Sequence, residues 1–402
     1  MSLAEHGIGW LNRPGTIGQS WNPVRGCSRV SEGCRHCYAE RIAARFSGPG
    51  KVFEGFARRV AGTPRWTGKV ELIPEKLAEP LRWRSPRTVF VNSMSDLFHE
   101  RLSDLAIASV FGVMAAAREH TFLILTKRPE RAAEWFQWAA GYPAGTPDCL
   151  CQREAYKLGV KIPLHGVKGT LKCYPWPLLN VLVGTSVEDQ PTADERIPHL
   201  LRCPVAGRFV SYEPALAGPV DFGFQSATCS CCPRWPSRWV FLPRPVRGDF
   251  HWSNIEAAAG FHRAESNPHG ALSIRTEHGL LGVKPAEFGC LPRLDWIIVG
   301  GESGPGARPF DLAWARSTVE QCKAAGVPCF VKQLGARPTG WWRPEGNPGP
   351  DPDFPWAIAG NAYPGDPDKP SPDDGWKLRD RKGGDPTQWP EDLRVQQWPE
   401  VS

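Results

Sequence analysis

The regular alternation of short apolar segments with helical segments constrains the fold of this chain more than any other feature. Continuous apolar runs are typical of parallel strands that are buried on both faces. Six such runs predict strands at residues 88–92, 121–126, 181–184, 208–212, 296–300 and 329–332, with weaker candidates at 19–21 and 69–72. Helical patterns fall between them at 38–46, 75–83, 103–118, 130–139, 192–201 and 312–324.

This order of strands and helices predicts an α/β fold, with the strands in a complete or partial (β/α) barrel. A doubly wound open sheet is the structural alternative. Two segments break the alternation, at 141–177 and 222–290, and we expect both to be insertions into loops of a core that spans residues 1–334. From 335 to 402 the chain is rich in Pro, Gly, Asp and Trp, which predicts an irregular tail that packs on the barrel.

Composition limits where such a chain functions. No segment approaches the roughly 20 consecutive apolar residues of a membrane helix. The N-terminus lacks a basic region followed by an apolar run, so it does not resemble a signal peptide. We therefore expect a cytoplasmic protein without a membrane partner. The formal net charge of +6 permits binding to nucleic acid or another polyanion but does not require it.

Polar residues follow nearly every predicted strand. In a parallel barrel the carboxyl ends of the strands converge on one mouth, where active sites lie. The candidate ligand-holding residues at these ends are Asn92, Ser93, Ser95, Asp96, Thr185, Ser186, Glu188, Gly300, Gly301, Glu302 and Arg308, and the candidate catalytic residues are Lys127, Glu213 and Lys332.

Each of these groups also has a plainer interpretation. Ser95 or Asp96 is suited to cap the turn that follows its strand. Lys127 and Arg128 are suited to pair with acidic residues at neighbouring strand ends, namely Glu188, Asp189 or Glu213. The glycine-rich loop at 300–306 lets backbone N–H groups approach a ligand, but it matches neither a P-loop nor the dinucleotide fingerprint, and such loops are often tight turns.

Three clustered cysteines near the start of the chain carry the most specific chemistry. Cys27, Cys34 and Cys37 have the spacing C-x6-C-x2-C, and Tyr38 follows directly. Three thiolates on one loop can hold three irons of a [4Fe–4S] cluster and leave the fourth iron open to a small molecule. The alternative is a zinc site that takes His36 as its fourth ligand, although structural zinc sites usually use two close cysteine pairs.

The remaining cysteines divide into two groups in the expected insertions and several single residues. The groups are Cys149, Cys151 and Cys173, and Cys229, Cys231 and Cys232. Clustered cysteines in a cytoplasmic chain favour metal ligation over disulfides, so both groups are candidates for a structural zinc. The single cysteines Cys203, Cys322 and Cys329 are typical of small core residues.

The Cys-x-x-Cys-Tyr sequence after a first barrel strand resembles the radical S-adenosylmethionine (SAM) superfamily. The commonest spacing there is C-x3-C-x2-C, so the first gap of this chain is longer. The wider sequence resembles a phage-associated family with the same expanded triplet, whose reaction is not assigned. The stretches that carry this resemblance are 21–23, 34–41, 91–99, 125–129, 186–190, 300–308 and 380–384.

The superfamily resemblance implies that Cys27, Cys34 and Cys37 hold a [4Fe–4S] cluster and that SAM binds its open iron. One electron from an external donor would cleave the sulfonium, and the resulting 5′-deoxyadenosyl radical would take a hydrogen atom from the substrate. The polar residues from Asn92 onward would hold the amino group or the ribose of SAM, and Lys127 or Lys332 would meet a carboxylate or a substrate group. The family resemblance also implies a companion protein.

The substrate stays open at this point. The basic chain and the Arg- and Trp-rich segment at 222–290 favour a nucleic acid base or a nucleotide. Two other classes remain as alternatives. One is a zinc-stabilised nucleic-acid-binding protein, and the other is a metal-dependent nuclease whose divalent ions are held by the strand-end carboxylates Asp96, Glu188, Glu213 and Glu302.

Overall fold

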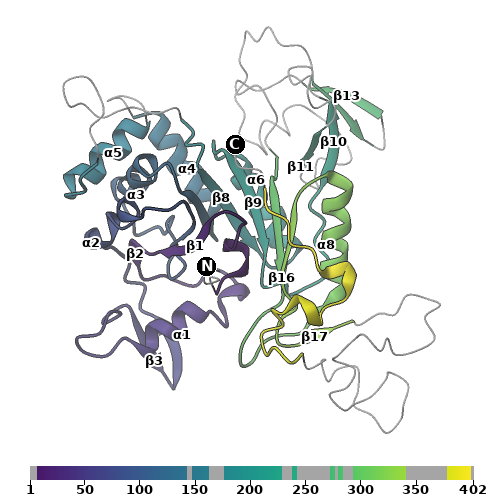
Figure 1. Cartoon of the computed structure of the whole chain (residues 1–402), viewed down its shortest axis with the longest axis horizontal. Helices are drawn as coiled ribbons and strands as arrows, with labels where there is room; N and C mark the ends of the chain where they lie inside the picture. Colours follow the sequence, from purple (N-terminus) through teal and green to yellow (C-terminus); the bar gives the residue numbers. More distant parts are fainter. Residues whose placement is uncertain are drawn as a thin grey trace.

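The predicted strands build one parallel sheet in the computed structural model of the chain, shown in Figure 1. The structure describes residues 7–142, 147–162, 176–228, 238–241, 272–276, 279–283, 293–340 and 378–399. The strands of the seven-stranded sheet are β1 (Ile17–Trp21), β6 (Arg87–Val91), β7 (Thr121–Thr126), β8 (Val181–Val187), β9 (Gly207–Tyr212), β14 (Trp296–Gly300) and β16 (Cys329–Gln333). All six strong strand predictions and the weak candidate at 19–21 are confirmed.

The strand order makes this sheet a partial β/α barrel. Each strand lies beside the next sheet strand along the chain, in the order β1-β6-β7-β8-β9-β14-β16, and every pair is parallel. Right-handed crossovers in an order that never reverses place the connecting helices on one face, and the sheet curls around the other. A doubly wound sheet requires a reversal of strand order, so that alternative is wrong.

The helices follow most of the predicted segments, but the helix expected at 75–83 is divided into a helix at Pro74–Leu77 and a 3-10 turn at Pro80–Arg82. The helices are α1 (Tyr38–Arg45), α2 (Pro74–Leu77), α3 (Asp104–Ala116), α4 (Pro129–Ala140), α5 (Pro147–Lys157), α6 (Gln190–Leu201) and α8 (Leu312–Ala325), with short 3-10 turns η1 (Gly9–Leu11), η2 (Glu32–Cys34), η3 (Pro80–Arg82), η6 (Pro386–Gln388) and η7 (Glu391–Leu393). Capping side chains fix where several begin. Ser103 accepts the N–H of Ala106 at the start of α3, and Asp189 and Thr192 form a capping box on α6.

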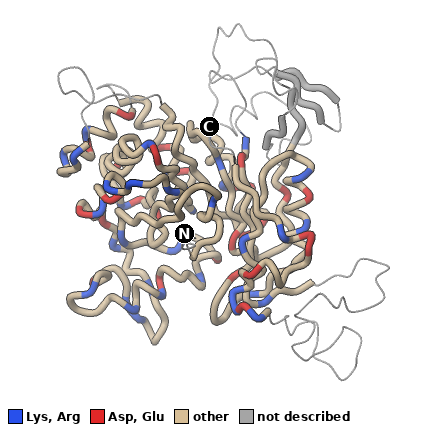
Figure 2. Tube along the Cα trace, viewed as in Figure 1, with Lys and Arg blue, Asp and Glu red and all other residues tan. Residues whose placement is uncertain are grey.

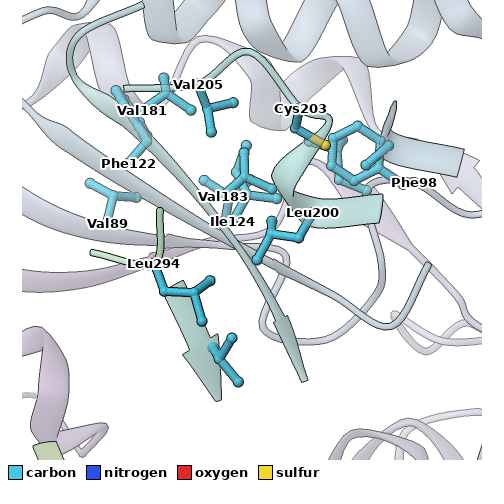
Figure 3. Close-up of a cluster of buried hydrophobic side chains, with 14 of the residues drawn as sticks. Val89, Phe98, Phe122, Ile124, Val181, Val183, Leu200, Cys203, Val205 and Leu294 are labelled. Atoms are coloured by element: carbon cyan, nitrogen blue, oxygen red, sulfur yellow. The ribbon is translucent and has the colours of Figure 1, made fainter. Parts of the chain in front are cut away.

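Both faces of the sheet are buried, as continuous apolar runs predict. On the helix side, alternate strand residues such as Val89, Ile124 and Val183 pack with Leu200 and Cys203 from the end of α6 and the turn after it (Figure 3). On the inner side, the strands contribute a second cluster with larger rings, made of Phe90, Leu123, Leu182, Phe209, Trp296, Ile298 and Phe330 together with Trp10 and Leu11 of η1. The inside of the barrel is therefore a packed core and not a pore.

The seam between the first and last strands is closed by both ends of the described chain. Turn η1 contacts β1, β6 and β16, and the ring of Trp10 lies 4.9 Å from that of Phe90. Residues 395–397 run antiparallel along β16, where Val331 N–H donates to Val395 O at 2.8 Å. The indole of Trp398 then donates to the carbonyl of Trp10 at 2.9 Å. The exposed edge of β16 is thus covered, which prevents pairing with another chain.

The weak candidate at 69–72 is confirmed only as the short strand β5 (Glu71–Leu72), which pairs antiparallel with β2 (Val24–Arg25) outside the barrel. Other elements were not predicted. A hairpin of β3 (Ala57–Val60) and β4 (Thr63–Trp66) packs on α1, and helix α5 packs on α3. Gly112 permits the helix contact, because a Cβ there would lie 2.1 Å from the carbonyl oxygen of Cys151. Short pairs and small sheets complete the fold: β15 (Phe310–Asp311) with β17 (Pro338–Thr339), and β10 (Phe224–Thr228), β11 (Arg238–Phe241), β12 (Leu272–Thr276) and β13 (Gly279–Val283).

Among the described residues, no helix combines the length and the apolar character needed to cross a lipid bilayer.

Candidate functional site

The cysteine loop, residues 26–37, leaves β2 and begins against the carboxyl end of β6. Gly26 forms a β-bridge with Ser95, whose hydroxyl donates to Val24 O at 2.9 Å. The backbone of Gly26 has φ +92°, and a Cβ there would lie 1.9 Å from the carbonyl oxygen of Lys69. Only glycine fits this left-handed and crowded position. Ser95 therefore holds β2 through its side chain and the start of the loop through its backbone bridge to Gly26, and it does not cap a helix.

The same loop is hydrogen-bonded to the residues after three further strands. Past β7, Arg128 donates to the hydroxyl of Ser28 at 2.7 Å. Past β8, Glu188 accepts from Ser31 Oγ at 2.9 Å. Past β14, Arg308 donates to Glu32 O at 3.0 Å. The loop thus lies across the edge where the strand ends converge, as the barrel argument predicts.

The three thiols of the loop are free and lie within electrostatic reach of one another. None forms a disulfide, and each residue is partly exposed. Burial of the sulfur raises the pKa of Cys27 to about 12; the charge of Asp96 adds to this, Arg128 opposes it, and the thiolates of Cys37 and Cys34 add to it. Burial also raises the pKa of Cys37, with a further contribution from Cys34. The raised pKa values keep the thiols of Cys27 and Cys37 protonated when no metal is bound, and a bound metal would displace these protons.

Three free thiols on one loop are donors that either a [4Fe–4S] cluster or, with a further ligand, a zinc ion could use. Among the described residues, no three His, Cys, Asp or Glu side chains, His36 included, gather closely enough to share one metal ion. A structural zinc ion would need such a group of ligands. In a [4Fe–4S] cluster each thiolate would bind a different iron of one cofactor. Its three ligands would be Cys27, Cys34 and Cys37.

Asp96 joins the ends of β6 and β7. Its Oδ1 accepts from Thr126 Oγ1 at 2.7 Å and from Phe98 N–H at 3.0 Å. Its Oδ2 accepts from Lys127 N–H and from the guanidinium of Arg128, both at 3.1 Å. All four acceptor positions of the carboxylate are occupied. In this arrangement Asp96 positions the strand ends and has no lone pair left for a ligand.

The carboxylate of Glu188, after the end of β8, is likewise occupied by hydrogen-bond donors of the protein. It is 1% exposed and accepts from Lys127 Nζ, from Arg196 at 3.0 Å and from Ser31. Burial alone would raise the pKa of Glu188, but the charges of Lys127 and Arg196 outweigh it and lower the pKa. The pairing of Lys127 with Glu188 is the plainer alternative that the sequence offered. Arg128, by contrast, pairs with Asp96 and Glu100 and not with the predicted partners.

Glu302 forms the third occupied carboxylate, at the end of β14. It accepts from Arg308 at 2.8 Å and from His36 Nδ1 at 3.0 Å. Burial alone would raise the pKa of Glu302, but hydrogen bonds from Arg308 and His36 more than offset it and lower the pKa to about 2. The predicted ligand residues Glu302 and Arg308 therefore bind each other and the cysteine loop.

The two glycines at the end of β14 serve packing. A Cβ on Gly301 would lie 2.8 Å from the side chain of Phe310 and 2.9 Å from Leu334 O. A Cβ on Gly300 would lie 3.1 Å from Gln333 O. The side chain of Phe310 and the backbone at Gln333 and Leu334 approach these positions closely.

Glu213 and Lys332 keep spare hydrogen-bonding capacity. Lys332 Nζ donates to Glu213 Oε1 at 2.6 Å, and both side chains are partly exposed. The pKa of the neighbouring Tyr38 phenol is raised by burial of its hydroxyl and then by the charges of Cys37 and Glu213, although the residue as a whole is 46% exposed. Tyr38 thus lies within electrostatic reach of both the cysteine loop and this ion pair.

The other predicted residues lie at the same edge. Asn92 is 3% exposed in a left-handed backbone conformation (φ +61°); its Oδ1 accepts from Val24 N–H at 3.3 Å, and its Nδ2 has no partner among the described residues. Ser93 donates to Asn22 Oδ1 at 3.2 Å. Thr185 donates to Thr126 O at 3.0 Å, and Ser186 is 4% exposed beside it.

Sequence reasoning missed the residues that hold the loop in place. Glu40 is 2% exposed and binds both Arg29 and the backbone N–H of Trp66. Arg196 reaches Glu188 from the second turn of α6. The available signal was a charged residue on the apolar face of each helix, beside Ala43 and Ala44 in α1 and beside Ile197 and Leu200 in α6.

The cysteines of the expected insertions give no metal site among the described residues. Cys149 is disulfide-bonded, against the expectation that this group ligates a metal, and Cys151 is a free thiol buried on α5. Cys173, Cys229, Cys231 and Cys232 lie outside the described residues. Cys203, Cys322 and Cys329 are buried, as predicted for small core residues.

Fold and site together define a partial β/α-barrel protein with a three-cysteine loop across the carboxyl ends of its strands. The profile of one protein family, described as "Protein of unknown function (DUF5131)", matches residues 8–350. The chain belongs to this family, whose description carries no activity. No curated protein and no solved structure matches the chain.

Proposed function

We propose that this protein is a radical SAM enzyme, with a [4Fe–4S] cluster held by Cys27, Cys34 and Cys37. The observation that carries the proposal is the position of the cysteine loop. Its three free thiols lie within electrostatic reach of one another, and the loop contacts the residues that follow β6, β7, β8 and β14. A cofactor held there opens onto the mouth of the barrel.

When bound, the cluster supplies the electron that cleaves SAM reductively and so initiates abstraction of a hydrogen atom from the substrate. The chain's own residues bind, orient and exclude water. Arg128 lies beside Cys27 and offsets the negative charge of its thiolate. The loop itself covers the strand ends, which limits the access of water to the site.

The residues proposed to touch SAM are those at this edge that retain capacity. Asn92 offers an unpartnered Nδ2. The hydroxyls of Ser93 and Thr185 donate to Asn22 and Thr126 and keep their acceptor lone pairs, and Ser186 adds a third hydroxyl. Asp96, Glu188, Glu302 and Arg308 act as positioning residues, because their polar atoms are occupied by one another and by the loop. Lys127 belongs to this second group, through its bond to Glu188.

Glu213 and Lys332 are the proposed substrate-contacting pair. The Lys332 ammonium and the Glu213 carboxylate lie 2.6 Å apart, so the mouth of the barrel carries one positive and one negative group there and no net charge. A polar group of the substrate would replace one member of the pair, by bonding either to Lys332 or to Glu213. The other member would then be free to accept a proton from the substrate or to donate one to it. An external one-electron donor and a companion protein remain part of this proposal.

The domain division is also a proposal. It comprises a core with insertions at 141–177 and 222–290 and a tail from residue 335. Helix α5 and strands β10 to β13 fall within the two insertions, and residues 378–399 of the tail pack along β16 and α8.

The nuclease alternative has weaker support. A nuclease requires its carboxylates to converge on shared metal ions. Here each carboxylate pairs with a different cation: Asp96 with Arg128, Glu188 with Lys127, Glu213 with Lys332 and Glu302 with Arg308. A zinc-stabilised nucleic-acid-binding protein stays the second alternative, and metal analysis of the full chain separates it from the proposal.

The decisive experiment is anaerobic reconstitution of the full chain with iron and sulfide. We expect a brown protein with about four irons per chain, which forms 5′-deoxyadenosine from SAM on reduction. Replacing Cys27, Cys34 or Cys37 by Ala should abolish both the iron binding and the formation of 5′-deoxyadenosine. The control Cys203→Ala removes a buried thiol far from the loop and should keep both. A colourless protein, or equal iron in all four variants, would overturn the proposal.

A further inference from the structure

The positive charge of this protein is concentrated in one segment, the basic extension (residues 41–69). It contains the end of α1 and the β3–β4 hairpin. The segment holds seven Lys and Arg side chains against one Glu, a net charge of +6, which equals the formal net charge of the whole chain. The remainder of the protein is therefore neutral overall. Figure 2 shows these cations on the extension that carries α1 and β3.

Most of these cations differ from those at the strand ends in lacking a carboxylate partner among the described residues, although the guanidinium of Arg45 lies over the ring of Phe46, 5.5 Å from its centroid. Lys69 pairs with Glu71 at 2.8 Å. The other six form no ion pair with any carboxylate of the described residues: Arg41, Arg45, Lys51, Arg58, Arg59 and Arg65. Arg59 and Arg65 donate only to backbone carbonyls, of Gly62 and Pro64. Their charges are left for an external anion.

The hairpin places like charges opposite each other. Arg58 on β3 is the direct cross-strand partner of Arg65 on β4, so both side chains project from the same face. Like charges at such positions destabilise a hairpin. Arg58 and Arg59 are exposed, and Ala57 and Trp66 at the base pack the hairpin on α1. The repulsion between Arg58 and Arg65 destabilises the hairpin, and a bound polyanion would reduce that repulsion.

Exposed apolar side chains adjoin this charge on α1. Tyr38, Ile42 and Phe46 are each at least 40% exposed and follow one another at intervals of four, so they share one face. An aromatic ring at such a surface can stack on a nucleobase. The face therefore combines cations with stacking groups.

The extension is fixed to the cysteine loop. The buried carboxylate of Glu40 binds Arg29 of the loop and the backbone N–H of Trp66 in β4, at 2.8 Å for the latter. Gly26 rests directly on Lys69. A ligand on the extension therefore stands at a constant position relative to the cysteines.

We propose that the basic extension binds the phosphate backbone of a nucleic acid. Arginine forks match phosphate geometry, and a two-stranded ribbon has a shape that enters a nucleic acid groove. An anionic membrane would instead favour a long helix with a wide apolar face, whereas the hairpin exposes few apolar side chains. The proposal that this surface binds nucleic acid does not depend on radical chemistry. Only its role in delivering a nucleotide to the cysteine loop rests on the proposed function.

The test compares two triple variants of the full chain with equal charge changes. R58Q/R59Q/R65Q removes cations of the hairpin, and R84Q/R202Q/K323Q removes three exposed cations elsewhere. Binding to fluorescein-labelled duplex DNA, single-stranded DNA and RNA is followed by anisotropy across a salt series. The hairpin variant should bind at least about tenfold more weakly, and the slope of log K against log salt should shrink by about 2–3. The control should stay close to wild type.

Several results would overturn the inference. They are negligible binding of every nucleic acid by the wild type, an equal loss in the control variant, or binding only to anionic phosphatidylserine vesicles. The measurement needs neither SAM nor reductant, so it remains informative if the protein fails to cleave SAM. Conversely, a wild-type protein that cleaves SAM but does not bind nucleic acid refutes only the proposal that the basic extension binds nucleic acid. A thermal melt of both variants checks that they fold.

Discussion

At the scale of single residues, the carboxyl edge of the sheet is a set of neutralised pairs. Asp96, Glu188 and Glu302 are nearly buried, and each accepts from at least one cation and one further donor. Removing either partner of such a pair leaves an uncompensated buried charge. These residues therefore contribute to the rigidity of the edge, and their carboxylate oxygens bond to other groups of the protein.

Glu302 gives a pH-dependent prediction. Its folded-state pKa of about 2 lies below the ordinary 4.5, so its stabilisation is complete above pH 4.5 and is lost as the pH falls towards 2. At about 1.4 kcal/mol per pKa unit, Glu302→Gln should lower the free energy of unfolding by about 3 kcal/mol near neutral pH. The difference from wild type should shrink steadily below pH 4.5, measured by urea titration at several pH values.

The matched control uses the second carboxylate that contacts Arg308. Glu32 is 74% exposed and lies 3.6 Å from that guanidinium. An exposed pair contributes at most about 1 kcal/mol, so Glu32→Gln should change stability little at any pH. A Glu302→Gln deficit that stayed constant down to pH 3 would contradict the assignment.

At the scale of elements, the cysteine loop, helix α1 and the β3–β4 hairpin form one unit. Small residues of α1 and β3, Ala43, Ala44 and Ala57, pack together with Trp66. Glu40 then adds polar bonds to Arg29 and to the backbone of β4. One buried carboxylate thus ties three segments that are consecutive in sequence but point in different directions.

Replacing Glu40 should loosen all three segments together. In Glu40→Ala, Arg29 and the N–H of Trp66 lose their acceptor, at a cost of a few kcal/mol. Amide hydrogen exchange should rise both in the hairpin and in residues 27–37. The control Glu54→Ala removes an exposed carboxylate bonded only to Gly50 N–H and should leave the cysteine loop unchanged. Faster exchange confined to the hairpin would show that the loop is held by other contacts.

At the scale of the whole molecule, the barrel is incomplete and relies on its seam. Seven strands leave an opening between β1 and β16, which η1 and residues 395–398 fill. Trp398 packs on Phe330 with ring centroids 5.1 Å apart and donates to Trp10 O. Segments almost 390 residues apart in sequence therefore stabilise each other.

Trp398→Ala should weaken the seam as a whole. The loss of a half-buried indole and its hydrogen bond should lower the free energy of unfolding by about 2 kcal/mol. Hydrogen exchange at residues 9–11 should increase, although they lie at the other end of the sequence. Trp314→Ala is the control, because Trp314 is also half-buried but packs on Phe310. If Trp398→Ala left residues 9–11 as protected as in the wild type, the coupling would be absent.

The sequence predicts the barrel well, because buried parallel strands leave a direct trace in apolar runs. Helix α5 and the hairpin escaped prediction, since α5 has little amphipathic pattern and Arg58 and Arg59 are unusual in a strand. Strand-end polar residues were predicted as a set, but their partners were not. Lys127 and Arg128 are neighbours in sequence, yet one reaches Glu188 and the other Asp96 and Glu100. Such choices depend on side-chain directions that no sequence pattern encodes.

The meeting of Trp10 and Trp398 gives the chain the connectivity of a ring. Joining the two segments by a short linker and opening the chain at exposed Ser85, between η3 and β6, would leave all seven strands in their present register. Circular permutants tolerate new ends at exposed loop positions of this kind. In such a permutant β1 would follow β16 along the chain, and the open seam would become an ordinary covalent connection.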